Sequence, residues 1–290
     1  MILELSSEFD IKRLCTYVGV SRSGFYKWKK NRNNPSPRAI AFCLNVALFR
    51  EYHEKYPSHG YRWLNAKIRL DKGYVFSDTY AHKCCKTAGI KSKVRRRKYS
   101  KAGERYRIYP NLTLAALDIN GPMQCIVSDM TAFWYQNQYY ELTLYMDLWN
   151  NEIIAHELST KRGDRTTYIN GLETVLKLKG TDSEMETVLH SDQGSVYASK
   201  DFNKKYENYS IIRSMSRAGT PTDNGAMEAI NGWIKAELFN DFHLTGEEDI
   251  QTEIGNYIHF FNEERPAYAL GYRTPVQYRN LHAQINVTIQ

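Results

Sequence analysis

Residues 124–159 decide the fold, and they read QCIVSDMTAFWYQNQYYELTLYMDLWNNEIIAHELS. Apolar and polar residues alternate along much of this stretch, and β-branched and aromatic residues are frequent, as is typical of half-buried strands. The pattern predicts strands over 124–133, 138–149 and 152–159, joined by short turns at Gln136-Asn137 and Asn150-Asn151. We therefore expect an antiparallel meander.

Downstream of the meander, helices are predicted to alternate with short strands. The apolar spacing predicts helices over 165–178, 200–206, 224–238 and 248–262, and strands over 186–192 and 210–216. Consecutive strands followed by alternating elements indicate an α/β domain, in which a mixed five-stranded sheet carries helices on both faces.

The chain before the meander is predicted to be all-α. A helix over 11–18, a turn at Gly19 and a helix capped by Ser21 match a helix-turn-helix, although any helical hairpin has this pattern. Helices over 38–56, 61–70 and 77–88 predict a second such unit. If the second helix of each pair approaches the major groove, cationic side chains lie near phosphate. The candidates for DNA contact in these helices are Arg22, Lys27, Lys29 and Arg62.

Charge is divided unevenly along the chain. Residues 1–110 contain 25 Lys and Arg against 8 Asp and Glu, whereas residues 111–290 contain 14 against 24. A basic part favours a polyanionic partner and an acidic part suits a domain that concentrates cations, although two solvated surfaces would also fit. Lys and Arg make up nine of the seventeen residues 91–107, which predicts either a phosphate-binding arm or a solvated linker. Its DNA-contact candidates are Arg95, Arg96, Arg97 and Lys98.

Composition excludes several classes of protein. No apolar run approaches the length of about 20 residues that spans a bilayer, and the first residues lack the features of a signal peptide. We therefore expect no membrane partner and a cytoplasmic, nucleoid-associated protein. The five cysteines lack the spacing of a structural zinc site and are predicted to be free thiols.

Three acidic residues stand where strands and a helix could bring them together. Asp129 lies near the end of the first strand, Asp192 follows the strand TVLH, and Glu228 lies inside a helix, with thirty-five residues between the last two. Magnesium prefers oxygen ligands, and two ions about 3.5–4 Å apart need several carboxylates from different elements. Carboxylates at strand ends and on a facing helix meet this need.

Several motifs carry a resemblance to a known family. SDMT, HSDQGS and SRAGTPTDNGAMEAINGWIKAE resemble the DDE catalytic core shared by retroviral integrases and bacterial insertion-sequence transposases. FNEERPAYALGYRTPVQY resembles the closing motif of the bacterial branch (OrfB type), with Ala267 and Ala269 in place of the usual His and Ser. HGYRWLNAKI resembles the helix-turn-helix that precedes the core in these transposases. The resemblance covers roughly residues 10–280.

The resemblance implies a ribonuclease-H-like fold and metal-dependent DNA cleavage and strand transfer at insertion-sequence ends. It implies Asp129, Asp192 and Glu228 as catalytic residues and as ligands of two Mg²⁺ ions, with Mn²⁺ as a substitute. Lys235 is implied as a contact to a transposon-end phosphate, although a solvated lysine is the plainer interpretation.

Helical spacing adds a prediction about the helix that carries Glu228. Asn224, Glu228, Asn231 and Lys235 fall on one face, and the opposite side presents apolar residues for the core. The predicted core residues are Met227, Ile230, Ile234 and Leu238.

Other polar residues and glycines receive structural interpretations. Asp147 is expected to be a surface or capping residue, and Asp223 a helix cap. His190 is expected to pack in the core or to orient a ligand. Gly194 and Gly219 are expected to allow positive φ or close approach of DNA.

We expect a helix-turn-helix at 1–34, a helical DNA-binding domain at 35–92, a basic linker at 93–115 and a catalytic core with a C-terminal helical segment at 116–290. The expected partners are double-stranded DNA, as transposon ends and target, and further copies of the chain, since synapsis of two ends favours a dimer or higher oligomer. In the resembling group the catalytic frame is often fused to an upstream frame, so such a partner is also expected.

Alternatives remain at this point. A transcriptional regulator with a degenerate core would be expected to lack one of the three acids. A general ribonuclease-H-like nuclease leaves the paired N-terminal helices and the segment 265–275 unexplained. A retroviral-type integrase would carry a His-His-Cys-Cys zinc module, whose spacing is absent.

Overall fold

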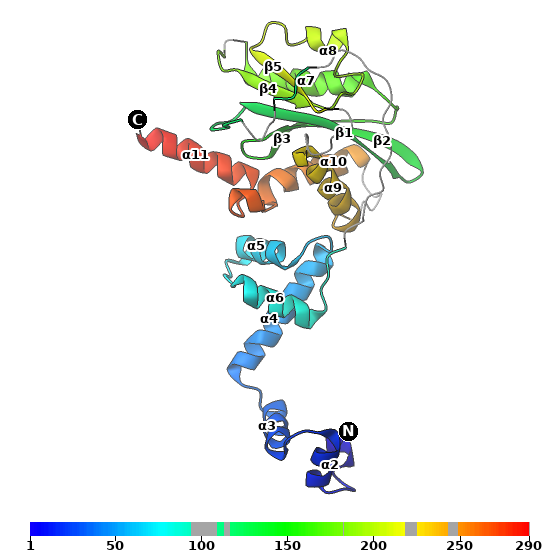
Figure 1. Cartoon of the computed structure of the whole chain (residues 1–290), viewed down its shortest axis with the longest axis vertical. Helices are drawn as coiled ribbons and strands as arrows, with labels where there is room; N and C mark the ends of the chain where they lie inside the picture. Colours follow the sequence, from blue (N-terminus) through cyan, green and yellow to red (C-terminus); the bar gives the residue numbers. More distant parts are fainter. Residues whose placement is uncertain (94–108, 113–116, 182, 218–224, 243–248, 290) are drawn as a thin grey trace.

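The computed structural model describes residues 1–93, 109–112, 117–181, 183–217, 225–242 and 249–289 (Figure 1). Within these ranges, the side chains of Asn33, Ala226, Glu228 and residues 284–289 are not described. No helix in the described ranges is both long enough and apolar enough to cross a membrane.

A five-stranded mixed sheet forms the centre of the C-terminal part. Its strands are β1 (Cys125–Tyr135), β2 (Gln138–Asp147), β3 (Glu152–Ser159), β4 (Thr187–Ser191) and β5 (Ile211–Met215). They lie in the order β3-β2-β1-β4-β5, with β1 to β3 antiparallel and with β4 parallel to both β1 and β5. Gln136 and Asn137 both have positive φ, as a tight β1–β2 hairpin turn requires. The predicted meander and mixed sheet are confirmed.

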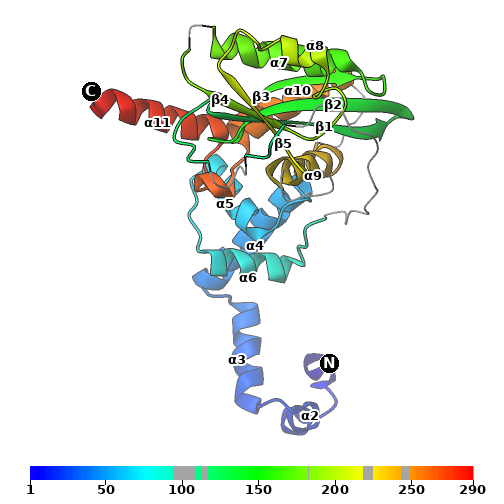
Figure 2. The same cartoon turned by 45° about the horizontal axis from the view of Figure 1, so that its top comes forward.

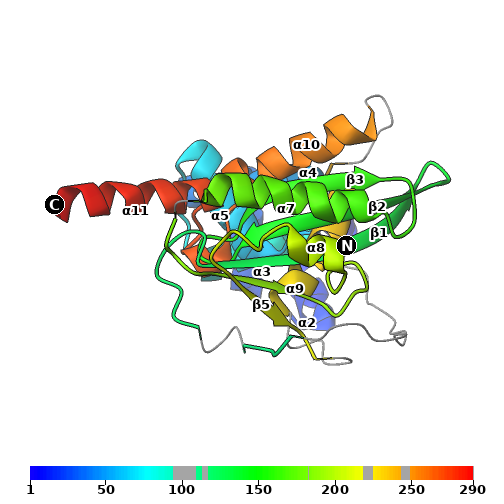
Figure 3. The ribbon, with the colours of Figure 1, turned by 90° about the horizontal axis from the view of Figure 1, so that it is seen from above.

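Helices cover both faces of this sheet (Figures 1 and 3). The helices of the catalytic part are α7 (Arg165–Lys179), α8 (Lys200–Lys204), α9 (Gly225–Asn240), α10 (Ile250–His259) and α11 (Pro275–Ile289). Because side chains alternate along a strand, Ile126 joins the apolar cluster under α7 and α8, whereas Val127 joins the cluster under α9 and α10.

The helix predicted to run to residue 262 changes geometry before its end. The α-helix α10 ends at His259, and the chain continues directly into a π-helical turn over Phe260–Glu264. Within this turn Asn262 bonds the edge strand β3: its Oδ1 accepts from Ile153 N and its Nδ2 donates to Ile153 O, both at 2.9 Å. The turn thus presents the Asn262 amide to the sheet edge.

The N-terminal part is helical, as predicted. It contains α1 (Ile2–Leu5), α2 (Ile11–Val18), α3 (Arg22–Asn33), α4 (Pro37–Lys55), α5 (Tyr61–Lys72) and α6 (Asp78–Ala88). Gly19 ends α2 in the left-handed conformation, and Ser21 caps α3 by accepting a hydrogen bond from Gly24 N. α4 to α6 lie beside α9, whereas α1 to α3 extend away from the sheet (Figures 1 and 2). The five cysteines are free thiols, as predicted.

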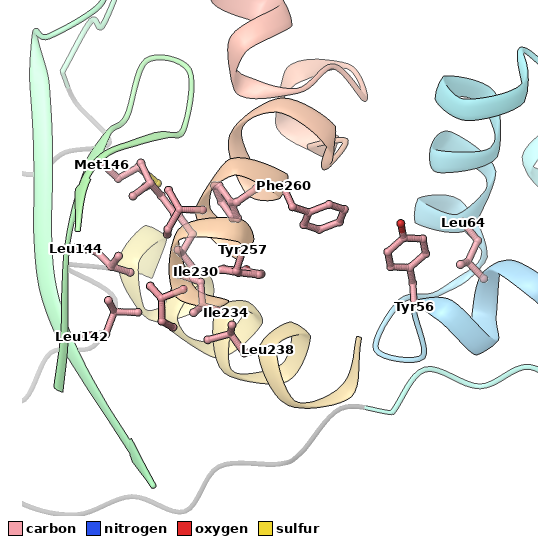
Figure 4. Close-up of a cluster of buried hydrophobic side chains, with 14 of the residues drawn as sticks. Tyr56, Leu64, Leu142, Leu144, Met146, Ile230, Ile234, Leu238, Tyr257 and Phe260 are labelled. Atoms are coloured by element: carbon pink, nitrogen blue, oxygen red, sulfur yellow. The ribbon is translucent and has the colours of Figure 1, made fainter. Parts of the chain in front are cut away.

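The unit formed by α4 to α6 is joined to the catalytic part by apolar packing. Tyr56, at the end of α4, stacks on Phe260 with ring centroids 5.8 Å apart. Figure 4 shows the cluster to which both rings belong, which runs from the sheet residue Leu144 through Ile234 of α9 to Leu64 of α5.

A buried polar network lies beside this packing, and we call it the joint network (Ser58, His59, Glu237, Asp241, Tyr257 and Arg265). Ser58 N and Oγ donate to Asp241 at 2.9 and 2.5 Å, and His59 Nε2 lies 3.1 Å from Asp241 Oδ2. Glu237 accepts from Arg265 Nε at 2.8 Å and from the Tyr257 hydroxyl at 3.0 Å. These contacts fix the α4–α5 connection to the C-terminal half of α9.

Gly171 provides a test of how tightly α7 packs on the sheet. A Cβ atom there would clash with the Tyr145 ring, which is fully buried and held by a 2.6 Å hydrogen bond from its hydroxyl to the Tyr168 carbonyl. Gly171→Ala is expected to lower the free energy of unfolding by about 1–3 kcal/mol in urea denaturation, despite the better helix propensity of alanine. Gly255→Ala in α10, where a Cβ meets open space, is the control and is expected to be neutral or stabilising. Equal effects of the two substitutions would contradict this packing.

Candidate active site

The register between β1 and β4 sets two of the predicted acids next to each other. Ser128 pairs with Ser191 in the parallel ladder, so Asp129 and Asp192 each follow one member of that pair. Neighbouring strands lie about 4.8 Å apart, so Asp192 leaves the end of β4 beside Asp129. Asp129 itself lies within β1, which continues to Tyr135 in its ladder with β2, so the predicted position near the end of the strand is wrong. Ser128 faces the side of the sheet that α7 covers, and its Oγ lies 2.7 Å from the hydroxyl of Tyr197, which is in the connection between β4 and α8. By alternation, Asp129 faces α9.

A hydrogen bond joins α9 to Asp129. Asn231 Nδ2 donates to Asp129 Oδ2 at 2.7 Å, and Met130 N donates to the other oxygen, Oδ1, at 2.9 Å. Glu228 lies three residues before Asn231, which is about 4.5 Å along the helix axis. The backbone of Glu228 therefore lies about one turn from Asn231, the residue that is bonded to Asp129, while the Glu228 side chain is outside the described residues.

The predicted apolar stripe of α9 is confirmed. Met227, Ile230, Ile234 and Leu238 are all buried. Asn231, predicted on the polar face, is buried as well at 2% exposure. The polar stripe therefore adjoins the apolar one, and the predicted opposition of the two sides is wrong. Lys235 is half-buried, one turn beyond Asn231, and Asn224 lies outside the described residues.

Asp192 is held by the loop that follows β4. Its Oδ1 accepts from Gly194 N at 2.8 Å, and a Cβ at Gly194 would lie only 2.8 Å from the same oxygen. Gly194 does not have positive φ, so that part of the prediction is wrong; the glycine leaves room for the Asp192 carboxylate. Gly219 lies outside the described residues.

The protonation of Asp192 reflects opposing influences. Desolvation by the surrounding protein raises the pKa of Asp192, while the hydrogen bond from Gly194 and the charge of Arg213 act in the opposite direction. Although neighbouring protein desolvates its carboxylate, Asp192 is exposed at the surface. A cation bound to this carboxylate would favour its ionised form.

Arg213 is a polar residue of the site that sequence reasoning missed. On β5 it is buried, and it donates from Nη1 to Leu189 O at 3.1 Å and from Nη2 to Ser191 Oγ at 2.9 Å. Desolvation lowers the pKa of Arg213, and its charge stabilises the ionised form of Asp192. A signal was available, because Arg213 occupies the inward position between Ile211 and Met215 in the period-two pattern of its strand.

Two other polar residues have structural roles. His190 is buried, with Nδ1 2.8 Å from Ser214 Oγ and Nε2 3.3 Å from Ser216 Oγ, in agreement with the core-packing interpretation. Asp147 is buried and accepts from the backbone N–H groups of Met123 and Trp149, so it caps a turn and the surface interpretation is wrong. Burial raises the pKa of Asp147. Asp223 lies outside the described residues.

Apart from Lys235, which lies on α9 with Glu228, the predicted DNA-contact residues lie on other parts of the chain than the acids. Arg22 and Lys27 are exposed on α3 and Lys29 is half-buried there, while Arg62 is exposed on α5 and forms an ion pair with Asp78 at 3.5 Å. Arg95, Arg96, Arg97 and Lys98 lie outside the described residues. The described structure therefore joins α9 to Asp129, and it leaves Arg22, Lys27, Lys29 and Arg62 on separate helices.

The donor set suits a hard cation. Asp129, within β1, and Asp192, directly after β4, offer carboxylate oxygens, the ligand type that Mg²⁺ prefers. Among the side chains that the structure describes, no three His, Cys, Asp or Glu residues form a complete ligand group. The third predicted ligand is Glu228, whose side chain is not among them.

Comparison with known proteins gives the family. Two models, both described as integrase core domain, match residues 119–221 and 209–275, and so together cover more than half of the chain, including all three acids. The chain is 26% identical over 280 residues to the putative transposase InsK of insertion sequence IS150 from Escherichia coli, with 96% of each chain covered. It is also 26% identical to transposase InsF of IS3A from the same species, with 94% of this chain and 95% of the relative covered.

Among solved structures, the HTLV-2 integrase catalytic core domain with magnesium aligns at 18% identity and a TM-score of 0.43, over 55% of this chain and 97% of that one. The integrase-core matches, the full-length transposase relatives and the five-stranded sheet agree with one another. The chain therefore belongs to the bacterial insertion-sequence transposases, polynucleotidyl transferases of DNA transposition whose integrase-type catalytic core has the ribonuclease-H-like fold.

Proposed function

We propose that the chain cleaves the ends of its insertion sequence and transfers them to target DNA, with Asp129, Asp192 and Glu228 holding two Mg²⁺ ions. One observation above all supports this proposal: the register of β1 and β4 sets Asp129 beside Asp192, and α9 is hydrogen-bonded to Asp129. Apolar packing of α9 on the sheet would not by itself require a hydrogen bond from this helix to Asp129.

The proposed phosphoryl-transfer chemistry needs two cations that are held by carboxylates in fixed positions. When bound, the two cations would supply Lewis acidity at the attacking and leaving oxygens of an in-line displacement at phosphorus, with Mn²⁺ able to replace Mg²⁺. Asp129 and Asp192 each follow one member of the Ser128–Ser191 pair, so the backbone hydrogen bonds of the β1–β4 ladder constrain their relative position. Arg213, buried behind Ser191, favours the ionised form of Asp192 that binds a cation.

We further propose the division of labour expected from the sequence. Residues 1–34 and 35–92 would bind DNA, 93–115 would link them to the core, and 116–290 would carry the chemistry. The exposure of Arg22 and Lys27 on α3 supports a DNA-facing role for that helix. Synapsis of two transposon ends favours a dimer or higher oligomer, and a protein from an upstream frame is a possible partner.

The function is tested by a strand-transfer assay of the full chain. DNA that includes the genomic flanks of its own gene is incubated with and without Mg²⁺, and the products are resolved by size and sequenced. Mg²⁺-dependent joining of an insertion-sequence end to target DNA is expected. End binding without joining in either Mg²⁺ or Mn²⁺, alone and with the upstream-frame protein, would refute the proposal.

The basic segment 91–107 gives a separate prediction about DNA affinity. Replacing Arg95, Arg96 and Arg97 together by Gln is expected to weaken DNA binding and to flatten its salt dependence, by about 0.9 in the log–log slope for each phosphate that the arm no longer neutralises. Fluorescence anisotropy between about 50 and 200 mM salt measures both quantities. The matched control replaces three exposed lysines of α7 and α8, namely Lys177, Lys200 and Lys204. Unchanged DNA affinity in the variant that lacks the three arginines would indicate that the segment is a solvated linker.

A further inference from the structure

Asn231 occupies an unusual place for an amide side chain. It is 2% exposed on α9, three residues after Glu228, and its Nδ2 donates to Asp129 Oδ2 at 2.7 Å. With Met130 N on Oδ1, both oxygens of the Asp129 carboxylate accept a hydrogen bond. The carboxylate is therefore held in one orientation before any cation is bound.

The other end of the same amide lacks a hydrogen bond. Asn231 Oδ1 is buried and has no hydrogen-bond partner among the residues that the structure describes. A buried acceptor without a donor destabilises the fold, and the same buried space could hold an apolar side chain at no such cost. The amide cannot satisfy this oxygen by turning over, because its oxygen would then face the Asp129 carboxylate.

Packing does not account for the residue. α9 is already held on the sheet by the buried side chains of Met227, Ile230 and Ile234. An additional hydrogen bond to an acid on β1 is expected where the orientation of that acid matters, since groups that orient metal ligands contribute strongly to metal affinity.

We propose that Asn231 is a positioning residue for the cation site: its amide N–H fixes the Asp129 carboxylate, and its buried carbonyl oxygen would accept a hydrogen bond from a water molecule of that site. This inference rests on the proposed function, because it takes Asp129 as a metal ligand. Its consequence is a division of tasks on α9, where Glu228 contributes a carboxylate and Asn231, one turn later, orients the carboxylate of β1.

The test measures Mg²⁺ binding as well as strand transfer. Asn231→Leu replaces the amide by an apolar side chain of similar size. Asn231→Ser replaces the amide by a smaller side chain, so that any effect of the bulk of leucine can be recognised. Each is expected to raise the Mg²⁺ dissociation constant of the full chain about tenfold or more in calorimetric titration. The half-saturating Mg²⁺ concentration for strand transfer should rise in parallel, and excess metal should restore the rate. DNA affinity should be unchanged.

Matched controls separate this role from a structural one. Asn240→Leu, at the end of the same helix, is expected to leave Mg²⁺ affinity unchanged. Asp129→Asn should abolish Mg²⁺ binding at the site. If either folded Asn231 variant binds Mg²⁺ as the wild type does, the inference is wrong while the proposed function stands. If the wild type shows no Mg²⁺ site that depends on Asp129, both are wrong.

Discussion

Replacing Asp129 by Asn is expected to reduce strand transfer by about 10³-fold or more, because loss of a ligand forfeits several kcal/mol of charge stabilisation in the transition state. The substitution keeps the size of the side chain and removes its charge. Binding to the insertion-sequence end should be largely retained, since the expected DNA contacts lie on other elements. Strand transfer and anisotropy, measured on the same preparation, separate the two effects.

Asp192→Asn and Glu228→Gln are expected to behave in the same way. Asp201→Asn is the matched control: it removes an exposed acid of α8, on the other face of the sheet, and should leave transfer unchanged. Substantial transfer by any one of the three site variants would remove that residue from the proposed metal site. Loss of DNA binding in all of them would point to misfolding and would be visible in thermal unfolding.

The second large effect is expected at Arg265, within the joint network. Burial by itself lowers the pKa of Arg265, but Glu237 raises it, so the side chain stays charged. Arg265→Met would leave the Glu237 carboxylate, which is 1% exposed, without its cation. Removing one partner of such a buried pair typically costs about 3–5 kcal/mol of folding free energy. Urea or guanidinium denaturation measures this loss.

Arg279 offers the control for this experiment. It pairs with Glu152 but is 45% exposed, so Arg279→Met is expected to cost at most about 1 kcal/mol. Adding Glu237→Leu to Arg265→Met should recover part of the stability, because no unpaired carboxylate then remains. Equal losses of stability in Arg265→Met and Arg279→Met would show that burial does not make the loss of Arg265 more costly.

The sequence predicted what is encoded locally. Period-two alternation and the pair Gln136-Asn137 gave the meander, and helical spacing gave the buried stripe of α9. Motif resemblance implied the three acids as metal ligands, which remains a prediction. In contrast, the positions of Asp129 and Asp192 relative to one another depend on the β1–β4 register, which no local pattern specifies.

Contacts between distant segments could not be predicted from the sequence alone. Ser58 and Asp241 lie 183 residues apart and carry no mutual signal, so the docking of the α4–α5 connection on α9 was not foreseen. Asn231 was assigned to a polar face because helical spacing treats polar residues as solvent-facing, whereas its amide is used inside the protein. The π-helical turn depends likewise on Asn262 meeting Ile153 across 109 residues.

The bond between Asn262 and Ile153 also bears on how copies of the chain can meet. β3 is an edge of the sheet, and free backbone groups at an edge can recruit a strand from another molecule. The Asn262 amide occupies both the N–H and the C=O of Ile153, much as a single residue of a neighbouring strand would. Intermolecular strand addition is therefore blocked at that residue, which disfavours edge-to-edge joining of the sheets of two copies.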